Sequence, residues 1–208
     1  MGSLEIIFGP MFSGKTELLI KKYNELYNKF WYQYALKTEL TGFCNEQFDE
    51  ICNTRIAINY FMDTRYKNNA IVSHDKNSIP SLNLETLSIL FTENYKSLLE
   101  KSKYIFINEA QFFPDLKDSI VKLLEIYNKN IVICGLDSDF KREKFGEMWD
   151  LIPHANSVVK LTGKCHYCTN KSLFSYRVTE ETDQAVIGTT NYLPLCRQCY
   201  FTKNRLII

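Results

Sequence analysis

The sequence predicts an α/β protein in which helices flank a parallel sheet, with a small cysteine-rich unit at the C-terminus. Three observations lead to this prediction: apolar strands alternate with amphipathic helices, the first strand runs into a phosphate-binding loop, and two C-x-x-C pairs lie near the C-terminus. Such alternation favours parallel pairing through right-handed crossovers, because each helix carries the chain back to the edge where the previous strand began. Ligands of these sheets bind at the carboxyl ends of the strands.

The first strand and the turn after it carry the strongest functional signal. A mostly apolar strand is predicted at residues 4–8. It is followed by a match to the pattern G-x-x-x-x-G-K-[ST], formed by Gly9, Pro10, Met11, Phe12, Ser13, Gly14, Lys15 and Thr16. In this pattern backbone N–H groups and a helix N-terminus bind phosphate, the lysine reaches the β- and γ-phosphates, and the hydroxyl binds Mg²⁺. An ordinary strand–turn–helix corner is the alternative. We expect a P-loop NTPase sheet of the RecA-like kind.

Further strands and helices are predicted in the middle of the chain. Residues 31–53 show no clear periodicity of apolar residues. Apolar runs predict strands at residues 55–61, 104–107 and 130–135. A helical or mixed stretch is expected over residues 83–102, and Asp115 is expected to cap a helix whose apolar residues recur as far as Tyr127. The main domain would cover residues 1–160, and the second unit residues 161–208.

Bulk composition excludes several classes of protein. The chain has 208 residues and a net charge of +1, so it has no large basic field of the kind that binds nucleic acid. It lacks an apolar run of membrane-spanning length, and its N-terminus enters a strand without a basic leader. We therefore expect a soluble cytoplasmic protein without membrane or nucleic-acid partners.

The strand at residues 104–107 is followed at once by Asn108 and Glu109. In P-loop proteins an acidic residue at such a strand end usually helps to hold Mg²⁺, but the first candidate position here is an amide. A carboxylate beside the γ-phosphate can take a proton from an attacking hydroxyl, which makes Glu109 the candidate general base. The alternative is a solvated residue at the start of a loop.

Asp63 and Arg65 follow the strand at residues 55–61. A guanidinium can bind the transferring phosphoryl group, whose charge is spread over three oxygens, and a carboxylate can hold a metal-bound water. A surface salt bridge between the two residues is the alternative, and spacing alone does not decide between these readings.

The two C-x-x-C pairs predict a metal site. They comprise Cys165, Cys168, Cys196 and Cys199. Four thiolates at this spacing favour a structural zinc ion with no position left for water, whereas a redox role is the alternative for a single pair. The long loop between the pairs, including residues 186–192, is of a length that can close over a small ligand, with a plain hairpin as the alternative.

Taken in order, these motifs resemble the type II thymidine kinases of animal cells, bacteria and large DNA viruses. The matching segments run along nearly the whole chain, at residues 9–16, 63–66, 73–75, 109–113, 136–146 and 153–162. The resemblance implies that ATP is the phosphoryl donor and thymidine the acceptor. Glu109 would deprotonate the 5′-hydroxyl, and Arg65 would steady the transferring group. Family members typically form homotetramers, with a dimer as the alternative here.

The resemblance also implies a set of binding residues. ATP would contact the phosphate loop from Gly9 to Thr16 together with Asp63, Asn108 and Gln111. The nucleoside would lie between apolar walls and a main-chain lasso, formed by Met11, Phe112, Leu136, Phe140, Gln184, Ala185, Val186, Ile187, Gly188 and Tyr192.

Three positions depart from the family pattern. The family usually has Asp where this chain has Asn108, so we expect weaker Mg²⁺ binding. Residues 31–53 resemble an insertion, and the loop over residues 187–192 is one residue shorter than usual. Two alternative functions stay open. One is a P-loop ATPase that acts on nucleic acid, and the other is a nucleotide-binding homologue that lost turnover through Asn108.

Overall fold

The computed structural model describes residues 1–26, 28, 54–63, 69–186 and 191–205, and a six-stranded sheet forms its centre. The strands are β1 (Ser3–Phe8), β2 (Arg55–Tyr60), β5 (Leu82–Leu84), β6 (Tyr104–Ile107), β7 (Asn130–Gly135) and β8 (Ser157–Lys160). Their order is β5-β2-β6-β7-β1-β8, and every neighbouring pair is parallel. The predicted α/β class and parallel sheet are confirmed.

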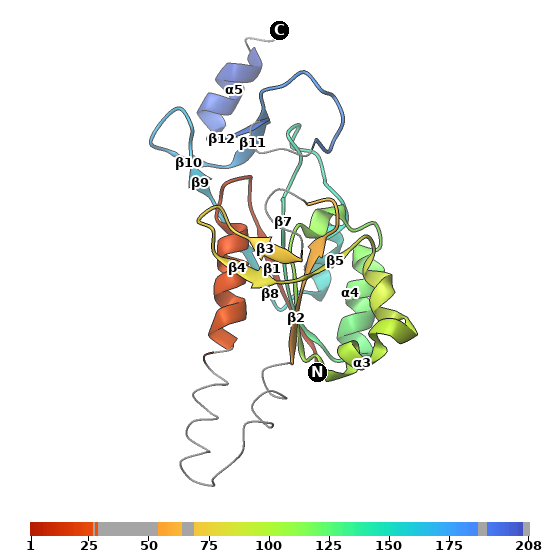
Figure 1. Cartoon of the computed structure of the whole chain (residues 1–208). Helices are drawn as coiled ribbons and strands as arrows, with labels where there is room; N and C mark the ends of the chain where they lie inside the picture. The colour runs from red at the N-terminus through yellow and green to blue at the C-terminus, as the bar shows by residue number, and fades with distance from the viewer. Residues whose placement is uncertain (27, 29–53, 64–68, 187–190, 206–208) are drawn as a thin grey trace.

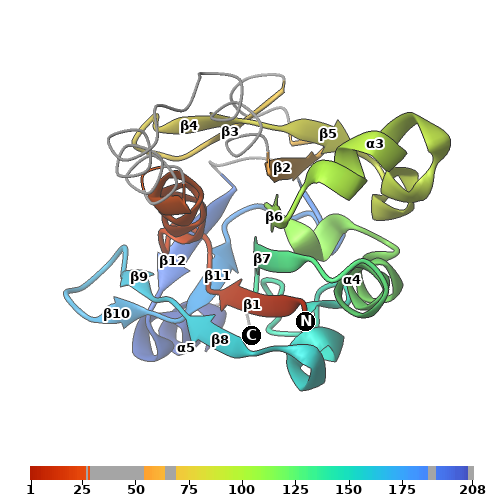
Figure 2. The same cartoon turned by 90° about the horizontal axis from the view of Figure 1, so that it is seen from below.

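Helices cover both faces of this sheet (Figures 1 and 2). On one face the helix over residues 15–26 buries Leu19, Ile20 and Tyr23 against Ile7 and Phe106. The other face is covered by α3 (Glu93–Lys101), α4 (Leu116–Glu125) and the 3-10 helices η1 (Leu87–Phe91) and η3 (Met148–His154). The central strands are apolar on both sides because each face meets a helix layer.

A smaller unit follows the sheet and lies at one end of the molecule (Figure 1). It contains β9 (Gly163–Lys164), β10 (Lys171–Ser172), β11 (Phe174–Arg177), β12 (Tyr192–Leu195) and α5 (Arg197–Arg205). Two antiparallel strand pairs and a separate apolar cluster around Cys165, Leu195 and Tyr200 hold it together. The predicted boundary at residue 161 falls in the link between β8 and β9.

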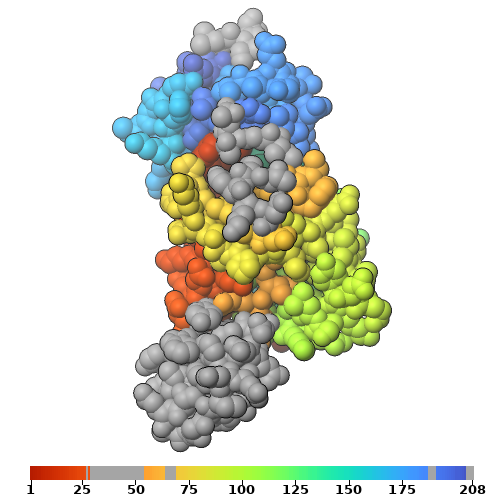
Figure 3. All heavy atoms as spheres, viewed as in Figure 1, coloured from red at the N-terminus to blue at the C-terminus, as the bar shows by residue number. Residues whose placement is uncertain are grey.

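A hairpin of β3 (Ala70–Val72) and β4 (Ser78–Pro80) lies beside the helix over residues 15–26. In the space-filling view this hairpin (yellow) and the C-terminal unit (blue) occupy the same face of the molecule (Figure 3). Asn77 in the hairpin turn donates a hydrogen bond of 2.9 Å to Glu17 in the helix. The hairpin is thereby fixed next to the phosphate loop.

The element predictions are largely confirmed, with corrections at particular residues. The strand predicted at residues 55–61 ends at Tyr60, and the helix predicted to reach Tyr127 ends at Glu125. Asp115 occupies the N-cap position of α4, but its carboxylate accepts from the backbone N–H groups of Leu87 and Ser88 instead of capping that helix. Residues 31–53 lie outside the described residues. No described helix is both long enough and apolar enough to cross a bilayer.

Candidate active site

A cavity of about 500 Å³ opens at the carboxyl edge of the sheet. The phosphate loop, the segments after β2, β6 and β7, the β3–β4 turn and the C-terminal unit all contribute to its walls. Each of these sheet segments directly follows a parallel strand, as the sequence predicted for a ligand site. The structure thus brings the separate motifs of the sequence to one place.

The phosphate loop forms one wall of this cavity from Met11 to Thr16. Lys15 is 8% exposed and its Nζ donates to the carbonyl of Pro10 at 2.8 Å. The backbone N–H of Met11 donates to Ser175 Oγ at 2.9 Å, so the C-terminal unit braces the loop directly. Gly9 and Pro10, which the sequence also predicts to contact ATP, do not line the cavity.

Three buried polar atoms at the loop end of the cavity have no hydrogen-bond partner among the described residues. They are Ser13 Oγ, Glu17 Oε2 and Ser73 Oγ, and all three residues line the cavity. Buried polar groups are nearly always paired in folded proteins, because an unpaired one carries its full desolvation cost. This end of the cavity is therefore built for a polar ligand.

Asn108 lies at the centre of a hydrogen-bonded chain beneath the loop. Its Oδ1 accepts from the Thr16 hydroxyl at 3.3 Å and from the Cys134 thiol at 3.1 Å. Its Nδ2 donates to Asn59 Oδ1 at 2.9 Å, and Asn59 Nδ2 donates to Asp63 Oδ2 at 3.4 Å. The chain links the hydroxyl expected to bind Mg²⁺ to the nearby carboxylate. Sequence reasoning missed Asn59, which lies inside a strand and carries no motif.

Cys134 is a neutral thiol in this network. Burial raises its pKa to about 12, and the carboxylate of Glu109 adds to the shift. The side chain is 1% exposed, which confirms the sequence interpretation of Cys134 as a small buried residue.

Glu109 follows β6 in a left-handed backbone conformation, with φ 52° and ψ 42°. Its carboxylate accepts a hydrogen bond of 2.7 Å from Gln111 Nε2, and Gln111 Oε1 in turn accepts from the N–H of Leu136 at 3.0 Å. Glu109 and Leu136 line the cavity, whereas Gln111 is 3% exposed and lies behind them. The sequence predicts that Gln111 contacts ATP; in the structure its side chain does not line the cavity and hydrogen-bonds to Glu109.

Two glycines make room for Gln111. A β-carbon at Gly135 would lie 2.4 Å from Gln111 Oε1, and one at Gly146 would lie 2.2 Å from the Gln111 carbonyl oxygen. Gly146 also has φ 61°, a conformation that side chains with a β-carbon rarely adopt. Gly135 therefore makes room for the amide side chain of Gln111, and Gly146 makes room for its main chain.

The far end of the cavity is apolar and aromatic. Phe112 stacks on Tyr60 at 5.3 Å between ring centroids and meets Phe145 edge-on at the same distance. The predicted walls Met11, Phe112, Leu136 and Phe140 all line this space, as do Gln184, Ala185, Val186 and Tyr192 from the C-terminal unit. Tyr60 and Phe145 also line the cavity but were not predicted, although Phe145 lies in the segment at residues 136–146 that matches the family pattern. The predicted residues Arg65, Ile187 and Gly188 lie outside the described residues.

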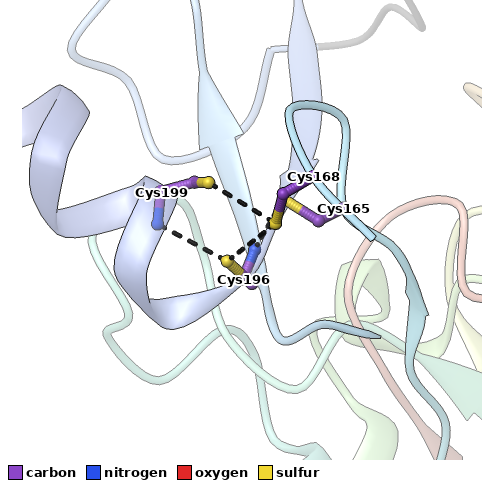
Figure 4. A group of neighbouring side chains, drawn as sticks. All are labelled: Cys165, Cys168, Cys196 and Cys199. Atoms are coloured by element: carbon purple, nitrogen blue, oxygen red, sulfur yellow. Dashed lines mark hydrogen bonds between the residues drawn. The ribbon is translucent and has the colours of Figure 1, made fainter. Parts of the chain in front are cut away.

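The four predicted metal ligands converge between the turn after β9 and the start of α5 (Figure 4). All four sulfur atoms lie within 4.8 Å of one another, with Cys168 Sγ 3.6 Å from Cys196 Sγ and 3.7 Å from Cys199 Sγ. Zn–S bonds of about 2.3 Å place tetrahedral thiolates about 3.8 Å apart, so the cluster fits zinc. Burial opposes ionisation of Cys165, but backbone N–H groups, including that of Cys196, outweigh it and lower the pKa of this thiol to about 6. Burial and the neighbouring thiols raise the pKa of Cys199 to about 12.

The chain is similar to known proteins over almost its whole length. A family model described as thymidine kinase matches residues 33–200. A thymidine kinase of Oryza sativa subsp. japonica is 36% identical over 201 residues, which are 96% of this chain and 66% of that protein. A thymidine kinase of Yaba monkey tumor virus is 32% identical over 98% of this chain and 97% of its own length. A cytosolic thymidine kinase of Gallus gallus is 30% identical over 97% of this chain and 78% of its own length.

Proposed function

Because the chain belongs to the thymidine kinase family, we propose that it transfers the γ-phosphoryl group of ATP to the 5′-hydroxyl of thymidine. The product would be dTMP, a precursor for DNA synthesis. One observation carries the proposal: the lysine of a phosphate loop and the carboxylate of Glu109 line the same cavity. The apolar, aromatic far end of this cavity supplies the surface that a nucleobase requires.

The triphosphate would lie in the phosphate loop. Backbone N–H groups and Lys15 would bind the β- and γ-phosphates, and the Thr16 hydroxyl would be a ligand of the Mg²⁺ that accompanies ATP. The unpaired atoms Ser13 Oγ and Ser73 Oγ support a polar ligand at this end. Asp63 and Asn108 would hold metal-bound water, with Asp63 supplying the charge that the amide lacks.

Glu109 would act as the general base. A carboxylate that is held by Gln111 needs no rearrangement before it accepts the proton of the 5′-hydroxyl. Once deprotonated, the oxygen attacks the γ-phosphorus while the bond to the ADP oxygen breaks. Arg65, by analogy with the family, would stabilise the charge on the transferring group.

The base would be read at the far end of the cavity. Phe112, Leu136 and Phe140 would enclose its apolar faces, and main-chain groups of the segment at residues 184–188 would bind its polar edge, with Tyr192 beside it. Such a pocket rejects the wrong base strongly, because a missing partner leaves a buried polar group unpaired.

We further propose a structural zinc ion on the four cysteines and a homotetramer, or a dimer, as the working form. The zinc would fold a unit too small to be stable alone. A cytoplasmic location matches the description of the Gallus gallus relative as cytosolic.

A direct assay tests the proposed activity. The purified chain is mixed with ATP, Mg²⁺ and thymidine, deoxyuridine or deoxycytidine, and nucleoside monophosphate is quantified. We expect dTMP as the main product and its loss in Lys15→Met. ATP hydrolysis that is stimulated by DNA without dTMP would favour a nucleic-acid ATPase. ATP binding without turnover would favour a homologue inactivated through Asn108.

A further inference from the structure

We propose that Arg177 is a positioning residue that fixes the segment at residues 181–186 over the cavity and thereby sets nucleoside affinity. The inference rests on the proposed function, because it concerns the side of the cavity assigned to the nucleoside. Arg177 ends β11 and does not itself line the cavity. No motif in the sequence pointed to it.

The guanidinium of Arg177 binds this segment through its main chain. Its Nη1 donates to the carbonyl of Glu181 at 2.8 Å and to that of Asp183 at 2.5 Å. Its Nη2 donates to the carbonyl of Gln184 at 3.2 Å and to the hydroxyl of Tyr192. One side chain therefore holds three peptide groups of a segment that has no helix or strand hydrogen bonds of its own.

The same guanidinium joins the segment to two cavity walls. Its central carbon lies 3.7 Å from the ring centroid of Phe140 and 5.1 Å from that of Tyr192. The Tyr192 hydroxyl also accepts from the N–H of Val186 at 3.3 Å. Phe140, Val186 and Tyr192 all line the cavity, so displacement of Arg177 would disturb three of its surfaces together.

Arg177 is only 5% exposed, and the nearby carboxylate of Glu181 interacts electrostatically with it. A buried cation is costly, and here carbonyl oxygens and aromatic faces compensate its charge together with that carboxylate. The planar fork of an arginine can serve several carbonyls at once, whereas an ammonium group acts as a single point charge. The geometry therefore requires arginine specifically.

A second contact ties the segment to the sheet domain. Gln184 Nε2 donates to Asp139 Oδ2 at 2.9 Å and to the carbonyl of Lys144 at 3.0 Å. This contact uses the Gln184 side chain, whereas Arg177 binds the Gln184 main-chain carbonyl. The segment is thus fixed from both units, and Arg177 supplies the larger share of its hydrogen bonds.

The test compares Arg177→Met and Arg177→Lys with Lys203→Met. Lys203 also makes a cation–π contact in the C-terminal unit, over Tyr167 at 4.6 Å, but neither residue lines the cavity. We measure the KM for thymidine, the KM for ATP, and the rate of hydrogen exchange at the amide of Val186, whose N–H donates to the Tyr192 hydroxyl that Arg177 also contacts. Thermal unfolding of each variant shows whether the fold is intact.

Both Arg177 variants are expected to raise the thymidine KM and the exchange rate at least about tenfold, and to leave the ATP KM within about twofold. Lys203→Met should match the unmodified protein. Equal losses for ATP and thymidine, or unchanged exchange at the Val186 amide, would overturn the inference. Should the unmodified protein not use thymidine, the proposed function fails, whereas the exchange measurement still decides whether Arg177 fixes the segment.

Discussion

Two residues of the cavity, Phe12 and Glu109, adopt left-handed backbone conformations, with φ 61° and 52°. For side chains with a β-carbon this conformation costs of order 1–3 kcal/mol and persists only where the surroundings impose it. At Glu109 the surroundings are Gln111 and the two glycines that admit it. The strain therefore lies at the two positions where the phosphate loop and the proposed base face the ligand.

Asn108→Asp should lower the Mg²⁺ concentration needed for half-maximal activity. A carboxylate at this position would still accept from the Thr16 hydroxyl, and it would add the charge that an amide lacks. The measurement is a Mg²⁺ titration of the initial rate at saturating ATP.

Asn59→Asp is the matched comparison for that titration. It adds the same negative charge at the next residue of the hydrogen-bonded chain, where Asn59 Oδ1 lies 2.9 Å from Asn108 Nδ2. We expect the Mg²⁺ concentration for half-maximal activity to change less in Asn59→Asp than in Asn108→Asp. An identical Mg²⁺ requirement in Asn108→Asp and the unmodified protein would show that residue 108 does not act through the metal.

Gln111→Met should lower kcat about tenfold and raise the thymidine KM while the ATP KM stays unchanged. Methionine keeps the volume, but it can neither donate to Glu109 nor accept from the N–H of Leu136. Steady-state kinetics with each substrate varied in turn gives the measurement. A rise in the ATP KM alone would instead support the ATP contact that the sequence predicted for Gln111.

At the scale of elements, strands with continuous apolar runs were predictable and short edge strands were not. β6 and β7 are buried on both faces, so their sequences show unbroken apolar stretches. β5 has only three residues, and three of the four β8 side chains are exposed. Neither sequence therefore shows the pattern of apolar residues from which a strand could be predicted. Both lie at edges of the sheet, where neighbouring strands decide the pairing.

Asp115→Asn should destabilise the protein by about 1–3 kcal/mol at neutral pH. Burial opposes ionisation of Asp115, but the N–H groups of Leu87 and Ser88 outweigh it and lower the pKa of this carboxyl below its ordinary 3.8. Because the folded-state pKa is lowered, the stabilisation is present above the ordinary value and is lost as the pH falls through the folded value. Urea unfolding of both proteins across this range gives the free energies.

The control variant for these unfolding measurements is Asp118→Asn, which removes an acidic side chain from the first turn of α4. Its free energy of unfolding should change much less than that of Asp115→Asn, because a charge near a helix N-terminus contributes only about 0.3–1 kcal/mol. A gap between Asp115→Asn and the unmodified protein that stays constant through acid pH would contradict the role of the ionised carboxylate.

At the scale of the whole molecule, residues of both the sheet domain and the C-terminal unit line the cavity. The local motifs in each unit could be predicted from the sequence, whereas the contacts between the two units could not. The phosphate loop, Glu109 and the cysteine pairs have fixed local spacings that identify them. The contact of Arg177 with Phe140 depends on tertiary packing between residues far apart in sequence, and no local spacing encodes it. The same holds for the hydrogen bond of 2.6 Å from the Tyr200 hydroxyl to the carbonyl of Phe140.

Removal of the proposed zinc ion should weaken thymidine binding at least about tenfold and change ATP binding less than about threefold. Tyr200 packs with Cys165 and Cys196 and bonds the carbonyl of Phe140, so loss of the metal would release one wall of the nucleoside end. The protein is treated with a chelator, dialysed and resupplied with Mg²⁺ before binding is measured. Zinc added back should restore thymidine affinity. Parallel loss of ATP binding would mean that the cysteine unit supports the whole fold.

The proposed activity requires that Glu109 removes the proton from a nucleoside hydroxyl while the phosphate loop holds the triphosphate. ATP-dependent dTMP formation and thymidine binding are measured side by side in the unmodified protein and Glu109→Gln. We expect kcat to fall by roughly 10²–10⁴-fold and the dissociation constant for thymidine to stay within about threefold. A Glu109→Gln protein that forms dTMP at the unmodified rate would show that Glu109 is not the general base.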